Sequence, residues 1–107
     1  MMYLILTELR GRPADEYGEL EKTIKALGNW GRQVSGTWML ESDRFNASQI
    51  RDFLRPHVVA GVDRIFVARI TKNWSGLNMS KSFPDWMKRR DFDAPRKDSD
   101  RQSDPES

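Results

Sequence analysis

Hydrophobic and polar positions follow two different periods along the chain, and each period predicts one type of element. Residues 3–6 are continuously apolar over the length of a strand, which is typical of a central strand covered on both faces or heavily on one. After the loop that contains Gly11 and Pro13, apolar side chains recur every three or four residues. This spacing predicts a helix that begins near Ala14 and buries one stripe of side chains. The stripe consists of Tyr17, Leu20, Ile24 and Leu27.

Residues 29–42 are strand-like in two pieces that meet at Ser35 and Gly36. The residues at this junction fit a bent or bulged passage as well as a tight hairpin. Because side chains alternate across a strand, Trp38 and Leu40 share one face and Met39 points to the other. We therefore expect Trp38 to be buried on a central part of a sheet.

A second helix is predicted from residue 47 to about residue 56. Asn46 is a favourable N-cap, and Gln49 can complete a capping box. Pro56 ends or kinks the last turn. The side chains expected to point inward are Ile50, Phe53 and Leu54.

The strongest strand prediction covers residues 62–70, which are rich in branched and aromatic side chains. Ile65 and Val67 share one face of this strand, and Phe66 lies on the other. Residues 82–88 are predicted to form one short helical turn that carries Phe83 and Trp86.

The resulting order is strand, helix, two strands, helix, strand, which predicts an α+β fold. It is the order of the ferredoxin-like fold, in which two helices cover one face of an antiparallel sheet. We expect a single domain over residues 1–90 and a disordered acidic tail over residues 91–107. The other face of the sheet is expected to be covered by a second copy, giving a homodimer. Its aromatic candidates are Phe66, Trp74, Phe83 and Trp86.

Composition excludes a few kinds of site and segment. The 107 residues contain no cysteine, which excludes disulfides and thiolate metal sites. No apolar run approaches the roughly 20 residues of a membrane span, and the first residues lack a basic leader, so we expect a cytoplasmic protein. Residues 91–107 carry a net charge of −3, which leaves +5 for the rest of the chain.

A basic body suggests a polyanionic partner such as nucleic acid. The candidate phosphate-binding side chains are Arg10, Arg12, Arg32 and Arg44, within a wider set that includes Arg51, Arg55 and Arg64. These arginines fit a phosphate-binding stripe and a solvated rim equally well. The single histidine, His57, is interpreted as a cap or surface group near a helix end, and the carboxylates of Asp52 and Asp63 are interpreted as solvated surface groups.

A family resemblance is carried by residues 3–9, 15–17, 24–30 and 35–40, and it continues through residues 50–54 and 62–67. Over residues 2–75 the chain resembles the SinR-like branch of the CRISPR-associated Cas-two family. The resemblance implies a ferredoxin-like homodimer in a prokaryotic antiviral defence or mobile-element context. The larger family includes a structural subunit of the spacer-integration complex and metal-dependent nucleases.

The resemblance implies a catalytic, metal-binding position at Glu8. Nuclease members of the family have an aspartate at the end of the first strand, paired across the dimer axis, which holds Mg²⁺. The matching residue here is Glu8, which is one methylene longer. Glu8 is therefore either an exposed carboxylate at a strand end or a catalytic metal ligand. We expect a non-catalytic module that binds nucleic acid or a protein partner, and the alternative is a magnesium-dependent nuclease for RNA or DNA.

Overall fold

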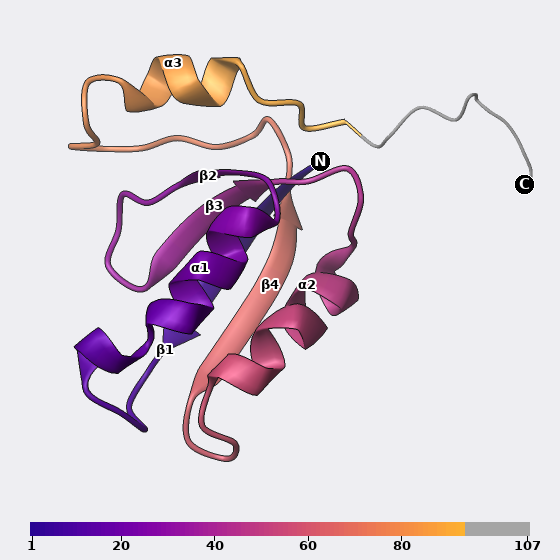
Figure 1. Ribbon diagram of the computed structural model, residues 1–107. Coiled ribbons are helices and arrows are strands. Elements are labelled where there is room, and N and C mark those ends of the chain that lie inside the picture. Colours follow the sequence, from indigo (N-terminus) through magenta and orange to yellow (C-terminus); the bar gives the residue numbers. More distant parts are fainter. Residues whose placement is uncertain (94–107) are drawn as a thin grey trace, which may run out of the picture.

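The computed structural model describes residues 1–93 and shows an α+β fold (Figure 1). Its strands are β1 (Met2–Glu8), β2 (Asn29–Gly31), β3 (Thr37–Glu41) and β4 (Arg64–Ile70). Its α-helices are α1 (Gly18–Ala26), α2 (Ala47–Leu54) and α3 (Phe83–Lys88), and 3-10 turns lie at Ala14–Glu16 (η1) and Arg55–His57 (η2). No helix in this described part of the chain has the length and apolar character needed to cross a membrane.

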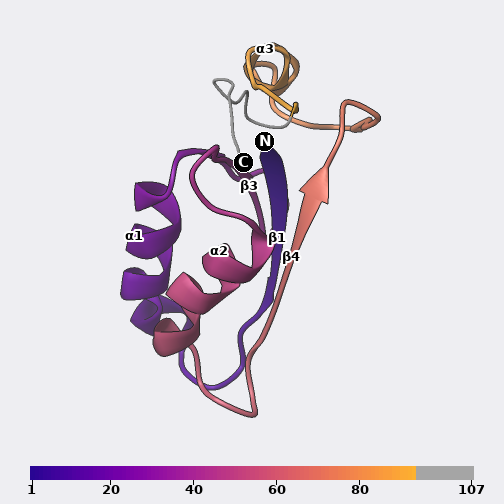
Figure 2. The ribbon, with the colours of Figure 1, turned by 90° about the vertical axis from the view of Figure 1, so that its right-hand side faces the viewer.

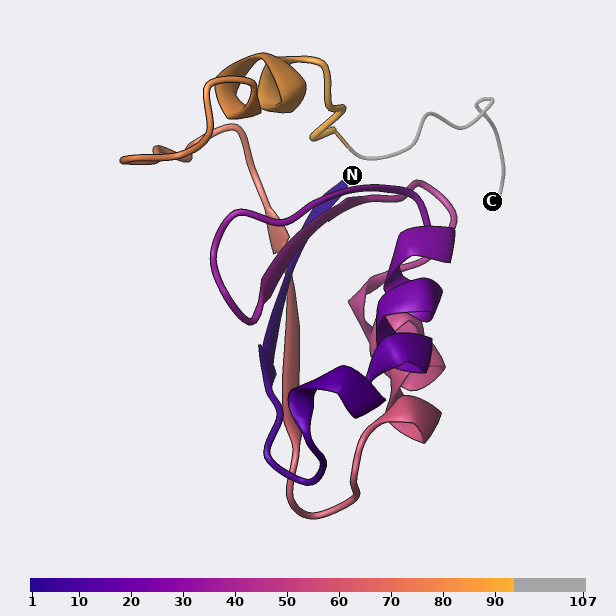
Figure 3. The same cartoon turned by 60° about the vertical axis from the view of Figure 1, so that its left-hand side comes forward.

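The four strands form one antiparallel sheet in the order β2-β3-β1-β4. Ile5 in the middle of β1 faces Trp38 on one side and Val67 on the other, so β1 is central and β4 is an edge strand. Figures 2 and 3 show α1 and α2 together on one face of this sheet. The expected antiparallel sheet with two helices on one face is confirmed.

The main core lies between this face and the two helices. Trp38 is only 2% exposed and Leu40 is fully buried, as the alternation along the strand predicted. The expectation for Phe53 was wrong, because its side chain is 42% exposed. Its ring instead packs edge-on against Phe45 with centroids 4.8 Å apart. The core side chains are Tyr3, Ile5, Tyr17, Leu20, Ile24, Trp38, Leu40, Ile50 and Leu54.

Local sequence explains where the elements begin and turn. The side chain of Asn46 accepts a hydrogen bond from the Gln49 N–H, and the Gln49 side chain accepts one from the Asn46 N–H, both at 2.9 Å. This capping box starts α2, as predicted. Gly36, with φ of +74°, turns the chain into β3, and its carbonyl accepts a 2.7 Å hydrogen bond from the N–H of Thr7.

The other face of the sheet is partly covered by the chain itself. Phe83 and Met87 of α3 are buried against Met2, together with Phe92. Trp74 and Trp86 pack at the margin of the same cluster. Three of the four aromatic residues expected to face a second copy are therefore covered within one chain, and only Phe66 remains largely exposed, at 62%.

The segment after α3 is fastened to the sheet by polar contacts. Nη1 of Arg90 lies 3.3 Å from Oε1 of Glu41, and both side chains are more than four-fifths buried. The Arg69 guanidinium donates a 3.1 Å hydrogen bond to the carbonyl of Phe92. The packed chain therefore continues at least to Phe92, beyond the domain boundary expected at residue 90. The remainder of the expected tail, residues 94–107, lies outside the described residues.

Candidate nucleic-acid interface

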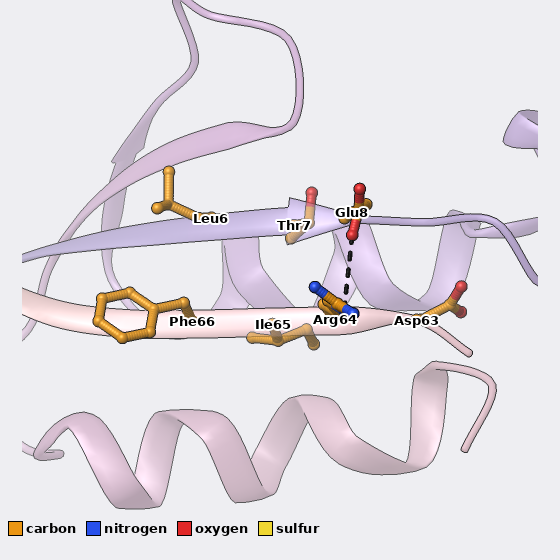
Figure 4. Close-up of a pocket in the computed structure, with 7 residues that line it drawn as sticks. All are labelled: Leu6, Thr7, Glu8, Asp63, Arg64, Ile65 and Phe66. Carbon is orange, nitrogen blue, oxygen red and sulfur yellow. Dashed lines mark ion pairs between the residues drawn. The ribbon is translucent and has the colours of Figure 1, made fainter. Parts of the chain in front are cut away.

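Glu8 lies at the end of β1, opposite Arg64 at the start of β4. Its Oε1 is 3.3 Å from Nη2 of Arg10 and 3.7 Å from Nε of Arg64. Figure 4 shows the ion pair between Glu8 and Arg64 across the two strands. The side chain of Glu8 is 53% exposed. One exposed carboxylate is thus shared by two guanidinium groups.

Asp63, directly before β4, fixes the loop that follows β1. Its Oδ1 accepts hydrogen bonds from the backbone N–H groups of Arg10 at 2.7 Å and Gly11 at 2.8 Å. Its Oδ2 accepts hydrogen bonds from the Tyr17 hydroxyl at 2.7 Å and the Val59 N–H at 2.8 Å. The expectation that Asp63 is simply solvated was wrong, because four donors from three segments converge on this carboxylate.

These contacts set the charge states of Asp63 and Tyr17. Burial raises the pKa of Asp63, but the hydrogen bonds from Val59, Arg10, Tyr17 and Gly11 outweigh it and hold the pKa well below its ordinary value of 3.8. Burial raises the pKa of the Tyr17 hydroxyl above 10.0, and the hydrogen bond to Asp63 raises it further. At neutral pH Asp63 is therefore ionised and Tyr17 is neutral.

Arg12 joins this loop to the end of α2. Its backbone N–H donates a 3.0 Å hydrogen bond to the Tyr17 hydroxyl oxygen, and its guanidinium carbon lies 5.6 Å from the centre of the Tyr17 ring. Nη1 of Arg12 donates to the carbonyl of His57 at 3.5 Å. Arg12 is consequently held beside η2, which begins with Arg55.

A second shared carboxylate lies on α2. Oδ1 of Asp52 accepts hydrogen bonds from Nε of Arg51 at 2.9 Å and from Nη2 of Arg55 at 3.1 Å. As at Glu8, two guanidinium groups share one exposed carboxylate. We name the surface where β1 ends, α2 ends and β4 begins the basic end. Its cationic residues are Arg10, Arg12, Arg55 and Arg64.

The other two predicted phosphate-binding residues do not belong to the basic end. Arg32 follows β2, where its Nη1 lies 3.3 Å from Oε2 of Glu21 and its guanidinium stacks 4.5 Å above the Trp38 ring. Arg44 follows β3 and lies over the Phe45 ring, at the end of the sheet where β1 begins. The structure thus brings Arg10 and Arg12 together and places Arg32 and Arg44 elsewhere.

Sequence reasoning missed the role of Asp63. One signal pointed to it, because Tyr17 belongs to the buried stripe and a buried tyrosine hydroxyl requires a hydrogen-bond partner. The partner lies 46 residues along the chain. No local pattern around Asp63 reveals that contact, which depends on the antiparallel pairing of β1 with β4.

A shallow apolar hollow of about 510 Å³ adjoins the basic end on the uncovered part of the sheet (Figure 4). Leu6 on β1 and Phe66 on β4 are directly opposite each other, and they are 40% and 62% exposed. These two apolar side chains form an exposed patch beside the basic end.

The magnesium ligand set that the family resemblance implies does not fit one copy of this chain. Within residues 1–93, no three His, Asp or Glu side chains come close enough to hold a metal ion. Glu8 already has two guanidinium partners, whereas Mg²⁺ takes several oxygen ligands. A site built on Glu8 would require a second copy of the chain.

Comparison of the chain with protein-family models, with curated proteins and with solved structures found no match in any of the three.

Proposed function

We propose that this chain is a ferredoxin-like homodimer of the Cas-two and SinR-like kind that binds nucleic acid without cleaving it. The basic end is the observation that carries this proposal. It presents guanidinium groups in excess over carboxylates, with the loop that bears Arg10 and Arg12 fixed by Asp63. The proposed setting is the cytoplasm of a prokaryote, in antiviral defence or a mobile element.

Arginine suits this role because its planar guanidinium binds phosphate oxygens in pairs. The backbone of Arg10 is held by Asp63 at 2.7 Å, and Arg64 begins a paired strand. The backbone therefore loses little conformational freedom at these positions when phosphates bind. The four arginines of the basic end, together with Arg51, outnumber the carboxylates of Glu8, Asp52 and Asp63, so a polyanion replaces water and counterions there.

The element order and the sheet order β2-β3-β1-β4 support the ferredoxin-like part of the proposal. The patch of Leu6 and Phe66 supports the homodimer, because a second copy would remove it from water. Since this patch adjoins the basic end, a two-fold axis through it would place two basic ends on one assembly and lengthen the nucleic-acid contact.

Binding and cleavage can be measured on the same samples. Purified protein is mixed with labelled RNA, single-stranded DNA and double-stranded DNA in the presence of Mg²⁺ or Mn²⁺. We expect binding without cleavage, and the double variant Arg10→Gln with Arg64→Gln should bind about tenfold more weakly. Lys22→Gln, which removes one exposed cation from α1, is the matched control and should leave binding unchanged.

Two outcomes would contradict this proposal. Equal affinities of the double variant and the wild type would show that the basic end is not the binding surface. Cleavage that is lost in Glu8→Gln and retained in His57→Ala would establish the magnesium-dependent nuclease instead, with the Glu8 carboxylates of two copies as metal ligands.

The homodimer has its own test. Light scattering should give twice the chain mass of 12.5 kDa, and Phe66→Glu should reduce the mass to that of one chain because it places a charge in the apolar contact. Val34→Glu changes an exposed valine in the loop before β3 and should leave the dimer intact. A single-chain mass over the whole concentration range would contradict the homodimer.

A further inference from the structure

β4 has one edge that pairs with no strand among the described residues. It is seven residues long, and within residues 1–93 its only neighbour in the sheet is β1. Backbone N–H and C=O groups of successive residues point alternately to the two sides of a strand. Only every second residue of β4 therefore pairs with β1, and the others present their backbone groups outward. Such an edge is a template for another extended segment.

A groove runs beside this edge, beneath α2. Figure 1 shows that α2 lies partly outside β4, on the side away from β1. The groove has a volume of about 240 Å³. Its lining residues are Ala47, Ser48 and Arg51 of α2 and Ile65, Phe66 and Val67 of β4.

We propose that an extended peptide of a protein partner adds to β4 as a fifth strand in this groove, with an apolar and an acidic side chain alternating on the face toward α2. Side chains two residues apart on a strand point to the same face. The apolar side chain contacts Ile65, Val67 and Ala47, which form the hydrophobic part of the groove. The acidic side chain reaches the guanidinium of Arg51.

The positive charge of Arg51 on α2 favours an acidic residue in the peptide. Arg51 is about half exposed, and it shares the single carboxylate of Asp52 with Arg55. A carboxylate from the peptide supplies the missing counter-charge and can accept two hydrogen bonds from one guanidinium. The Ser48 hydroxyl, one helical turn before Arg51 along the groove, adds a polar contact.

The position of α2 disfavours a second copy of β4 as the occupant. A two-fold pairing of β4 with itself would set the two strands about 4.8 Å apart. Each α2 extends beyond its own β4, and a helix with side chains is about 10 Å wide, so the two helices would collide. A single strand that brings no helix of its own fits the space.

This inference goes beyond the proposed nucleic-acid binding and does not rest on it. The groove residues differ from the four arginines of the basic end. Failure of peptide binding and failure of nucleic-acid binding are therefore distinguishable, because Arg10→Gln with Arg64→Gln affects only the second.

The test uses the full chain and a blocked, labelled peptide of about nine residues, long enough to pair with β4, in which valine and glutamate alternate at the odd positions and threonine fills the even ones. We expect saturable binding at about 100 µM or below, with amide NMR shifts concentrated in β4 and in the first turns of α2. The same peptide with alternate backbone nitrogens methylated cannot complete the strand pairing and should bind at least about tenfold more weakly.

Arg51→Gln should weaken binding of the glutamate peptide about fivefold and leave a glutamine version of the peptide unaffected, because only the first makes the ion pair. Lys22→Gln is the matched control and should bind like the wild type. Equal binding of the methylated peptide, shifts centred on Leu6 instead of β4 and α2, or no binding at millimolar peptide would each overturn the proposal.

Discussion

The hydroxyl of Tyr17 donates a 2.7 Å hydrogen bond to the carboxylate of Asp63, across 46 residues of sequence. The contact joins the start of α1 to the start of β4. The same carboxylate holds the backbone of Arg10, so a residue of the main core and a residue of the basic end share one acceptor. The stability of the fold and the geometry of the candidate interface are therefore coupled at Asp63.

Asp63→Asn should lower the free energy of unfolding by about 1–2 kcal/mol, because an amide nitrogen cannot accept two of the four hydrogen bonds. Asp52→Asn, which changes an exposed ion pair on α2, should cost less than about 0.5 kcal/mol. Urea denaturation of both variants measures this difference. Equal midpoints for the two variants would contradict the structural role assigned to Asp63.

Stability should also depend on pH through Asp63. Its pKa is lower in the folded protein than the ordinary 3.8, so its stabilising effect is present above that value and is lost as the pH falls below it. The difference in unfolding free energy between the wild type and Asp63→Asn should therefore shrink as the pH is lowered from about 6 toward 2. Urea denaturation at a series of pH values tests this, and a difference that stays constant throughout would count against it.

Trp38→Ala should cost about 3–5 kcal/mol and unfold much of the protein, because the side chain is 2% exposed in the middle of the core. Trp30→Ala is the comparison, since Trp30 is 39% exposed on the edge strand β2 and should cost clearly less. An unchanged denaturant midpoint for Trp38→Ala would show that β3 presents its other face to the core.

Met87→Ala tests the cover that α3 forms on the second face. The side chain is fully buried against Met2 and Phe83, so its loss should cost about 2–4 kcal/mol. Leu77→Ala, at a position 84% exposed, should change stability by less than about 0.5 kcal/mol. If the two variants unfold alike, α3 is not packed on the sheet as described.

Local patterns in the sequence were enough to predict the layers of the fold. The alternation around Trp38 gave the buried face of β3, and Asn46 with Gln49 gave the start of α2. Phe53 was misplaced because its position on the helical stripe lies at the margin, where Phe45 from the preceding loop packs against it.

The second face and the site depend on contacts between distant segments, which periodicity does not encode. Phe83 and Trp86 were expected to contact a second copy of the chain. The chain instead turns back after β4, and α3 packs against the sheet. The arginines were equally visible in the sequence, yet only the paired ends of β1 and β4 bring Arg10 and Arg64 to one carboxylate.

The most direct test of the basic end is the salt dependence of nucleic-acid affinity. Affinity for single-stranded RNA is measured over a range of salt concentrations for the wild type, for Arg10→Gln with Arg64→Gln, and for Lys22→Gln. Each lost phosphate contact lowers the slope of log affinity against log salt by about 0.7, so the double variant should lose about 1.4 and Lys22→Gln nothing. An unchanged slope in the double variant, or an affinity indifferent to salt, would contradict binding through the basic end.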